Sequence, residues 1–465
     1  MKPYKTLIFI ILTVALLAVA CLVFPAGGVE VGGVTLRMPS MARVLGTESD
    51  SAALDVEAYL ADAENPELQD VRDSIEFLSR VADTADTRFW LPYDEFFDPL
   101  FARMERAAAE SRTVRVVHYG DSQIEMDRMS SRLRAALQHT FGGSGAGMVP
   151  FRTIIGSPAV SIAASGSLVH QAPFGDSTVH RSRRGPYGPM IQDFRLAGQA
   201  STTIKAPTNK RVDSLLGSFQ TVTLLACTRG RLNVAFGNRK ASLDTNFVFD
   251  TTGVVAAKLR LDSALNTIRV NVSGDAELFG IMVDGAGGVA VDNIPMRGCS
   301  GQQFTLVDSA QLADAYRLMD VGLVIMQFGG NSVPYLRSRK PLDTYCHSIG
   351  RQIDRVRNCC PGALVLFIGP SDMSTSVNGR LQSYPYLDSV VDGLRRTALE
   401  HGAAYWSIYH AMGGHNSMTA WVSQGLGGQD YIHFSQRGAD IIGDRLADAF
   451  MNLYDLYRLR RKIKN

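Results

Sequence analysis

Strand-like and helix-like patterns alternate in two separate parts of this chain, and this alternation limits the fold more than any other feature. In the first part, the β-branched run Val114–Tyr119 leads through a tight turn into a helical pattern over Glu125–His139. The second part is predicted to contain, in order, helix Thr305–Leu318, strand Val321–Phe328, helix Asp343–Asn358, strand Ala363–Ile368, helix Tyr386–His401, strand Ala403–Ile408 and a last helix from Ser435. Apolar strands that alternate with helices are typical of a parallel sheet covered on both faces. The sequence therefore predicts an α/β fold.

Between these two parts, residues 151–290 show no long helical pattern. They contain short strand-like runs, such as Thr221–Ala226 and Leu278–Val283, separated by Gly, Asn, Asp and Ser. This pattern is typical of an antiparallel β-sandwich. We therefore predict one α/β domain split into residues 111–150 and 291–465, with a β-sandwich of residues 151–290 inserted after its first strand.

The N-terminus predicts export. Lys2 and Lys5 precede Leu7–Phe24, an uncharged and mostly apolar segment that would be about 27 Å long as a helix, roughly one bilayer core. Positive charge before an apolar span places the N-terminus in the cytoplasm and the body across the membrane. The favoured interpretation is an uncleaved signal anchor; cleavage after Ala20 and lipidation at Cys21 stay open. We expect a protein of the periplasm or cell envelope, held in the inner membrane.

The segments before the first strand are divided at residue 25. Residues 1–25 are the signal anchor or signal peptide, and residues 26–110 are a spacer that ends in a first helix. The spacer begins with a candidate hairpin over Val29–Met38, and its helix is the amphipathic pattern Tyr93–Glu110.

Composition excludes several classes of protein. With 465 residues, of which 46% are hydrophobic and 20% charged, and a mean hydropathy of +0.01, the chain is neither disordered nor a multi-pass membrane protein. The net charge is +2, and the N-terminal lysines and the tail Asp455–Asn465 carry more than this excess, so the body is mildly acidic. We therefore predict no nucleic-acid partner. The six cysteines and the histidines match neither a disulfide framework nor a zinc site, so no metal or other cofactor is predicted.

Ser122 is the candidate nucleophile. It lies in a Gly-Asp-Ser-Gln sequence where the first strand turns into a helix, which is the edge of the sheet where open α/β folds place their sites. A second Gly-Asp-Ser sequence, Gly175–Ser177, follows a proline and has no strand before it. Local context therefore favours Ser122.

A serine hydroxyl needs a base to accept its proton, and His433 is the candidate. It directly precedes the last predicted helix, and Asp430 can fold back across the loop to bond one ring nitrogen and fix the tautomer. His410 and His415, in a Gly-rich loop, are weaker candidates. His118 lies on the first strand, where we expect it to be packed or hydrogen-bonded.

Acyl transfer also needs hydrogen-bond donors for the developing oxyanion, each worth about 3–4 kcal/mol. Asn331 follows the strand Val321–Phe328 and so lies on the same sheet edge as Ser122. Gly301 is a candidate for a backbone N–H donor. Either residue by itself is also compatible with a plain turn.

Taken together, these residues resemble the SGNH hydrolase superfamily, the Gly-Asp-Ser esterases. Its four sequence blocks contribute Ser, Gly, Asn and His in that order, and Ser122, Gly301, Asn331 and the Asp430/His433 pair match in order. The resemblance implies a flavodoxin-like three-layer α/β/α fold. It also implies that Ser122 is the nucleophile, His433 the base and Asp430 its orienting residue, with an oxyanion hole formed by Ser122, Gly301 and Asn331.

The resemblance covers about residues 111–150 and 291–450, and it departs from the usual pattern at one position. Gln123 replaces the leucine that usually follows the serine, a variant found in envelope carbohydrate-active members. The inserted β region resembles, in position and size, the carbohydrate-binding module of peptidoglycan O-acetylesterases. Its aromatic residues Tyr187, Phe194 and Phe219 are candidates for stacking on sugars, although aromatics in a sandwich are more often core.

The function expected from this resemblance is that of a serine esterase that removes O-acetyl groups from cell-envelope carbohydrate through an acyl-enzyme. One alternative is an envelope O-acetyltransferase that uses the same three residues. Another is a non-catalytic glycan-binding protein.

Overall fold

The computed structural model describes residues 29–31, 34–36, 71, 74–80 and 88–464, except 177, 182–184, 210, 211 and 239–242. The chain divides into two compact units, Met1–Arg72 and Asp73–Asn465. The predicted membrane segment Leu7–Phe24 lies outside the described residues, as do Ala20 and Cys21. Among the helices that are described, none combines the length and the apolar character needed to cross a bilayer.

The described part of the first unit contains the predicted hairpin. Strands β1 (Val29–Val31) and β2 (Val34–Leu36) pair antiparallel. In the second unit, residues 74–80 are helical. All further elements also belong to the second unit.

The centre of the second unit is a six-stranded sheet. Its order is β11 (Gly288–Pro295), β4 (Thr113–Gly120), β12 (Val321–Gln327), β13 (Leu364–Gly369), β16 (Ala404–Ser407) and β3 (Phe89–Trp90). All neighbouring strands pair in parallel except β3, which is antiparallel to β16. In chain order the five parallel strands are arranged 2-1-3-4-5, the flavodoxin-like arrangement of doubly wound sheets. The predicted α/β class is confirmed.

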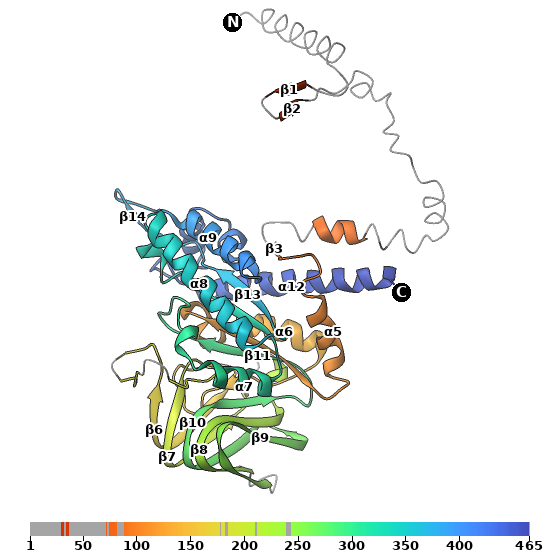
Figure 1. Ribbon diagram of the computed structural model, residues 1–465, viewed down its shortest axis with the longest axis vertical. Helices are drawn as coiled ribbons and strands as arrows, with labels where there is room; N and C mark the ends of the chain where they lie inside the picture. The colour runs from red at the N-terminus through yellow and green to blue at the C-terminus, as the bar shows by residue number, and fades with distance from the viewer. Residues whose placement is uncertain are drawn as a thin grey trace, which may run out of the picture. The chain divides into compact units, whose positions relative to one another are not determined.

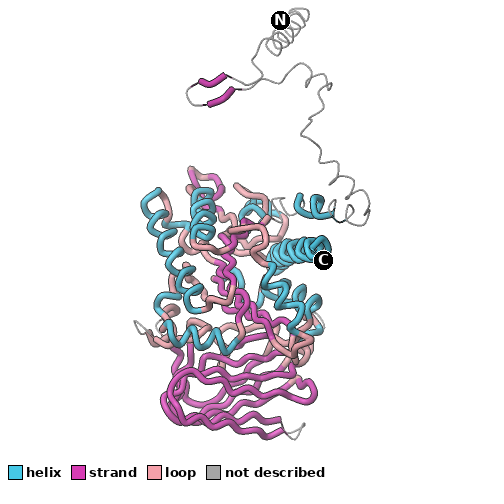
Figure 2. Tube along the Cα trace, turned by 45° about the vertical axis from the view of Figure 1, so that its right-hand side comes forward, coloured by secondary structure: helices cyan, strands magenta, loops and turns pink. Residues whose placement is uncertain are grey.

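Helices cover both faces of this sheet (Figures 1 and 2). Along β12, Leu323 and Ile325 face one hydrophobic core while Val324 and Met326 face another, because successive side chains of a strand point to opposite sides. The first core is completed by α5 (Asp98–Ala107), α6 (Ser130–Phe141) and α12 (Gln436–Lys464). The second is completed by α7 (Ser309–Met319), α8 (Arg339–Cys359) and α9 (Leu387–Glu400).

Short elements complete the α/β part. They are η1 (Ser122–Asp127), η4 (Phe304–Leu306), η5 (Val333–Tyr335), the hairpin β14 (Ser374–Val377) and β15 (Arg380–Ser383), α10 (Ile408–Ala411) and α11 (Ser417–Ser423). The predicted strands and helices of the second alternating part are all present, with ends shifted by a few residues. Strand β11 was not predicted, because its short run follows directly on the strands of the insertion.

The inserted region forms one sheet, not the predicted sandwich of two. Its strands are β5 (Gly147–Val149), β6 (Ser161–Gln171), β7 (Asp193–Lys205), β8 (Phe219–Asn238), β9 (Leu243–Leu265) and β10 (Thr267–Asp284), with the short helix η2 (Ser214–Leu216) between β7 and β8. They pair antiparallel in the order β6-β7-β10-β8-β9, and β5 adds to β10. In Figure 2 these strands form one end of the second unit.

A row of glycines explains how a single sheet encloses a core. Gly166, Gly198, Gly274, Gly230 and Gly253 lie on the five successive strands, and each has a positive φ between 102° and 156°. Residues without a Cβ adopt this conformation at little cost, so all five strands bend along one line. Apolar residues from both sides of the bend belong to one core cluster. The sequence pattern was read as separate short strands because these glycines interrupt long ones.

The inserted sheet is joined to the α/β sheet by a buried charge cluster. Arg115 of β4 donates to Asp292 of β11 at 2.6 Å and to Asp284, the last residue of β10, at 2.5 Å. Asp292 also accepts from the backbone N–H of Met148 in β5, at 2.7 Å. Burial lowers the pKa of Arg115, but the two carboxylates outweigh it and raise the pKa above its ordinary value.

The basic C-terminal tail forms the end of helix α12. Arg460 pairs with Asp98 at 2.5 Å, and Arg461 pairs with Glu105 at 2.6 Å, both acids belonging to α5. These two positive charges therefore complement a neighbouring helix of the same chain.

Candidate active site

Ser122 follows β4 after one intervening residue, Asp121, and Asn331 follows β12, the neighbouring strand. The chain reverses its direction of progress across the sheet between these two strands, since β11 lies on one side of β4 and β12 on the other. At such a switch point the loops after the two strands diverge and leave a crevice at the carboxyl edge. The topology therefore places both residues at the position where doubly wound folds bind their ligands.

The structure brings together Ser122, His433 and Asp430. Ser122 Oγ lies 2.8 Å from His433 Nε2, and His433 Nδ1 lies 2.7 Å from Asp430 Oδ2. Because Nδ1 faces the carboxylate, its hydrogen lies there and Nε2 is left to accept from the Ser122 hydroxyl. This is the arrangement that activates a serine for nucleophilic attack.

Hydrogen bonds within its own loop keep Asp430 ionised. Its Oδ1 accepts from the backbone N–H groups of Ile432 and His433, each at 3.0 Å. Partial burial raises the pKa of Asp430, but these bonds and the His433 ring outweigh it, and the net pKa lies below the ordinary value.

The turn that carries Ser122 is strained. Met126, Asp127 and Met129 all have positive φ, near 60°, which costs non-glycine residues energy and recurs at functional sites. Asp127 is held by a buried, bidentate ion pair with Arg134, at 2.5 and 2.9 Å. We predicted a helix from Glu125, but helix α6 begins only at residue 130 because this turn comes first.

Asn331 uses both hydrogens of its side-chain amide in this structure. Its Nδ2 donates to Asp121 Oδ2 at 3.2 Å and to the Cys299 carbonyl at 3.0 Å. Asp121 also accepts from the backbone N–H of Gln123 at 3.0 Å. Burial raises the pKa of Asp121 to about 6, although the Gln123 bond opposes this shift.

The structure places Gly301 away from the wall of the cleft. Gly298, three residues earlier, lines the cleft together with Ser122 and Asn331. Gly301 has a φ of +82°, and a Cβ at this position would lie 2.8 Å from the Phe328 ring. Packing therefore explains the glycine at position 301, and its role as an oxyanion donor stays a prediction.

These residues line a cleft of about 560 Å³ that has both polar and apolar walls. At one edge, Arg297 pairs with Glu125 through both carboxylate oxygens, at 2.5 and 2.6 Å. At another, the Tyr335 side chain lines the cleft while the residue is 77% exposed. Sequence reasoning missed Tyr335, Arg297 and Gly298, because no local pattern separates a cleft residue from any other loop residue.

The alternative site residues lie elsewhere. His118 is buried and bonded to Gln327 at 3.0 Å and Ser130 at 2.9 Å, as expected for a packed histidine, and burial lowers its pKa to about 4. His410 bonds Ser407 at 2.7 Å, and His415 lies 3.5 Å from Asp388. None of the three histidines lines the cleft.

The second Gly-Asp-Ser sequence and the predicted sugar-stacking residues have no part in the cleft. Asp176 is an exposed loop residue that accepts from the Thr178 N–H at 2.8 Å, and Ser177 lies outside the described residues. Tyr187, Phe194 and Phe219 are all buried in hydrophobic cores. They are therefore not accessible to a sugar ring.

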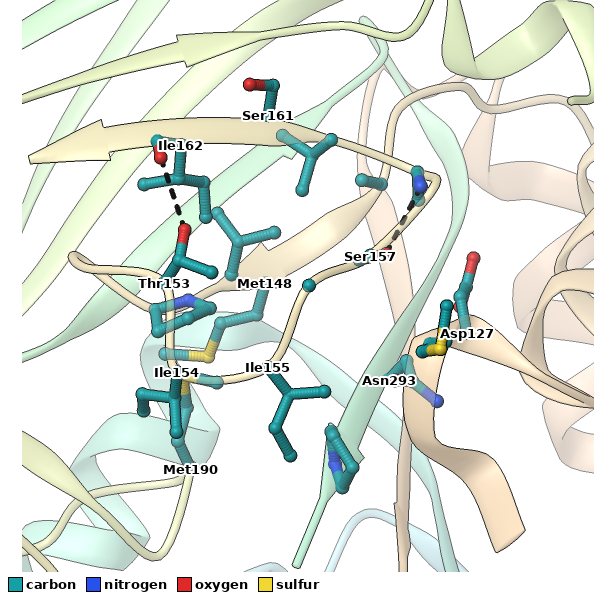
Figure 3. A pocket seen from close by; sticks show the side chains of 18 of the residues that line it. Asp127, Met148, Thr153, Ile154, Ile155, Ser157, Ser161, Ile162, Met190 and Asn293 are labelled. Carbon is teal, nitrogen blue, oxygen red and sulfur yellow. Dashed lines mark hydrogen bonds between the residues drawn. The ribbon is translucent and has the colours of Figure 1, made fainter. Parts of the chain in front are cut away.

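A second hollow, of about 320 Å³, lies where the inserted sheet meets the α/β part (Figure 3). Its walls are mostly apolar and include Met148, Ile154 and Met190. Met126 reaches this hollow, whereas Glu125, its neighbour in the nucleophile turn, lines the cleft. The hollow contains neither Ser122 nor His433, so the candidate chemistry belongs to the cleft.

The described residues include neither a grouping of metal-ligand side chains nor a disulfide. Within them, no three His, Cys, Asp or Glu side chains are grouped so that they could hold a metal ion. Cys227, Cys299, Cys346, Cys359 and Cys360 are free thiols.

Part of the chain that carries this site matches a known protein family. Residues 271–441 match the model of the GDSL-like Lipase/Acylhydrolase family. The chain therefore contains a GDSL-like acylhydrolase domain. This confirms the resemblance found in the sequence. The match includes Asn331, Asp430 and His433 but begins after Ser122, which the inserted sheet separates from the other blocks.

One solved structure shares the fold of this chain. This structure, described as a peptidoglycan O-acetylesterase, is 21% identical with a TM-score of 0.60, and the match covers 78% of this chain and 96% of that chain. A family two carbohydrate esterase from Clostridium thermocellum in complex with cellohexaose is 11% identical with a TM-score of 0.26, covering 62% of this chain and 100% of that one. A likeness at that score supports no conclusion. Comparison with curated protein sequences gives no significant match.

Asp430 is expected to be essential for efficient ester turnover. In Asp430→Asn, the amide no longer holds the His433 tautomer that accepts the serine proton, so kcat for 4-nitrophenyl acetate should fall by about 10²- to 10⁴-fold. The matched control is Asp176→Asn, in the second Gly-Asp-Ser sequence, which should retain wild-type kcat. Equal kcat values for the two variants would contradict the role of Asp430.

Proposed function

We propose that this acylhydrolase is a serine acetylesterase that removes O-acetyl groups from cell-envelope carbohydrate. The observation that carries the proposal is the Ser122–His433–Asp430 hydrogen-bonded array, in which Ser122 and His433 line a cleft of about 560 Å³. An assembled array of this kind disfavours a non-catalytic glycan-binding protein. The fold shared with a peptidoglycan O-acetylesterase supports the choice of substrate.

In the proposed reaction, the Ser122 hydroxyl gives its proton to His433 Nε2 as Oγ attacks the acetyl carbonyl. Asp430 stabilises the imidazolium that forms. His433 then returns the proton to the departing sugar oxygen, which leaves an acetyl group on Ser122. A water molecule, activated by His433 in the same way, attacks this ester and releases acetate.

The oxyanion that forms during attack is stabilised by hydrogen-bond donors. We assign these to the backbone N–H groups of Ser122 and Gly301 and to the Asn331 side chain. Asn331 Nδ2 makes a longer bond to Asp121, at 3.2 Å, than to the Cys299 carbonyl, at 3.0 Å. The substrate oxygen therefore shares the hydrogen now directed at Asp121, while the Cys299 bond keeps the amide oriented.

Tyr335 supports a carbohydrate as the substrate. Its ring lines the cleft and is largely exposed. Exposing a large aromatic surface at a cleft costs solvation free energy unless a ligand covers it. The apolar face of a sugar ring is a suitable cover, because its C–H groups pack on the π-face while its hydroxyl groups stay in water.

The first experiment measures acetate release from O-acetylated glycan. The wild-type protein is expected to release acetate and to hydrolyse 4-nitrophenyl acetate, and Ser122→Ala should lose both activities by at least about 10³-fold, since it lacks the nucleophile. A fluorophosphonate should label Ser122 in the wild type only. A rise in glycan acetylation when an acetyl donor is supplied would identify a transferase instead. Absence of Ser122 labelling in the wild type would overturn both the esterase and the transferase hypotheses.

The proposed sugar contact is tested by separating the two substrates. Tyr335→Ala should raise KM for the acetylated glycan by about tenfold, as expected for the loss of one aromatic contact. Hydrolysis of 4-nitrophenyl acetate, which has no sugar, should stay within twofold of wild type. A parallel loss on both substrates would show that Tyr335 does not act through the sugar.

We also propose that residues 1–25 hold the enzyme at the outer face of the inner membrane. The support is the order of charge and apolar residues in the N-terminal sequence. The full chain should sediment with membranes, resist alkaline carbonate and be digested by protease only after the outer membrane is opened. Mass spectrometry of the N-terminus distinguishes the outcomes: retained residues 1–25 support the anchor, whereas cleavage after Ala20 or a lipid on Cys21 overturns it.

A further inference from the structure

We propose that Gln123 is a positioning residue that holds the His433 loop against the nucleophile turn. This inference rests on the proposed function, because its role is to keep the base in reach of Ser122. Gln123 is also the position at which the sequence departs from the usual pattern of the family, which has leucine there. The structure shows what a glutamine does that a leucine does not.

The side chain of Gln123 bonds the backbone on both sides of His433. Its Nε2 donates to the Ile432 carbonyl at 2.8 Å, and its Oε1 accepts from the Phe434 N–H at 3.3 Å. The residue itself is buried. Since the two bonds are made to the residues immediately before and after the base, they restrain the backbone that sets the direction of the imidazole.

Arg128, in the same turn, adds to this restraint. It donates to the Phe434 carbonyl at 3.1 Å and to the Ser122 carbonyl at 2.7 Å. Its Nε donates to the Glu125 carbonyl at 3.0 Å. Thus, one guanidinium joins the nucleophile residue to the residue that follows the base.

The His433 loop needs this support because it lies at the surface. The side chains of His433 and Asp430 are 37% and 48% exposed, and Tyr431 has a left-handed φ of +56°. Backbone bonds of the loop run from Gly428 N–H to the His433 carbonyl, from Tyr431 N–H to the Gly428 carbonyl and from Ser374 N–H to the Tyr431 carbonyl. None of these three connects the loop to the turn that carries Ser122, whereas the Gln123 bonds do.

An isosteric variant and a matched control separate the effect of Gln123 on the His433 loop from its effect on stability. Gln123→Met keeps the length of the side chain and removes both hydrogen bonds. Gln138→Met does the same to another buried glutamine, whose Nε2 donates to the Gly145 and Val289 carbonyls, both at 3.3 Å, away from the cleft. Both variants lose a buried amide, so both report the cost to stability, but only the first releases the loop.

We expect Gln123→Met to lower kcat for 4-nitrophenyl acetate about ten- to hundredfold, the factor for two hydrogen bonds of ordinary strength. KM should stay within about threefold, because the cleft walls are unchanged. Gln138→Met should keep wild-type kcat with a similar fall in Tm. The inference is overturned if Gln123→Met retains kcat, or if both variants lose activity in proportion to Tm.

A second measurement separates this inference from the proposed function. The rate of fluorophosphonate labelling of Ser122 depends on the Ser122–His433 pair and requires no acetylated glycan. In Gln123→Met it should fall by the same factor as kcat, and in Gln138→Met it should not change. If wild-type protein labels but releases no acetate, the proposed substrate is wrong, while the labelling rates still decide the role of Gln123.

Discussion

One buried guanidinium, that of Arg115, holds the inserted sheet to the α/β sheet at the point where the chain leaves one and returns to the other. It joins Asp284, at the end of the inserted sheet, to Asp292, on the returning strand β11. Two carboxylates buried there without this cation would carry a large desolvation penalty. The cluster joins the two sheets where the chain returns beside β4, and this return sets the order of the parallel sheet.

The active site follows from that order. With β11 on one side of β4 and β12 on the other, Ser122 and Asn331 end neighbouring strands at the switch point. The returning chain continues from β11 into the segment that carries Gly298. His433 arrives from the far end of the chain, and Gln123 and Arg128 bind its loop to the nucleophile turn. Residues separated by a whole inserted sheet thus meet within one cleft.

Local sequence patterns predicted much of the α/β fold and of the candidate site. The β-branched and helical periodicities identified the strands and helices of the α/β part, and the order of sequence blocks singled out Ser122, Asn331, Asp430 and His433. The errors came where partners distant in sequence decide the outcome. The single bent sheet was read as a sandwich because its glycines interrupt the strand pattern.

By itself, the sequence determined the fold class, the split of the α/β domain and the residues able to perform acyl transfer, since periodicity and residue chemistry are local properties. Only the tertiary structure decided which glycine lines the cleft, that Tyr187, Phe194 and Phe219 are buried while Tyr335 is exposed, and why a glutamine follows Ser122. Burial and hydrogen-bond partners depend on segments brought together by folding. A glutamine that bonds a loop from the other end of the chain has no signature in its own surroundings.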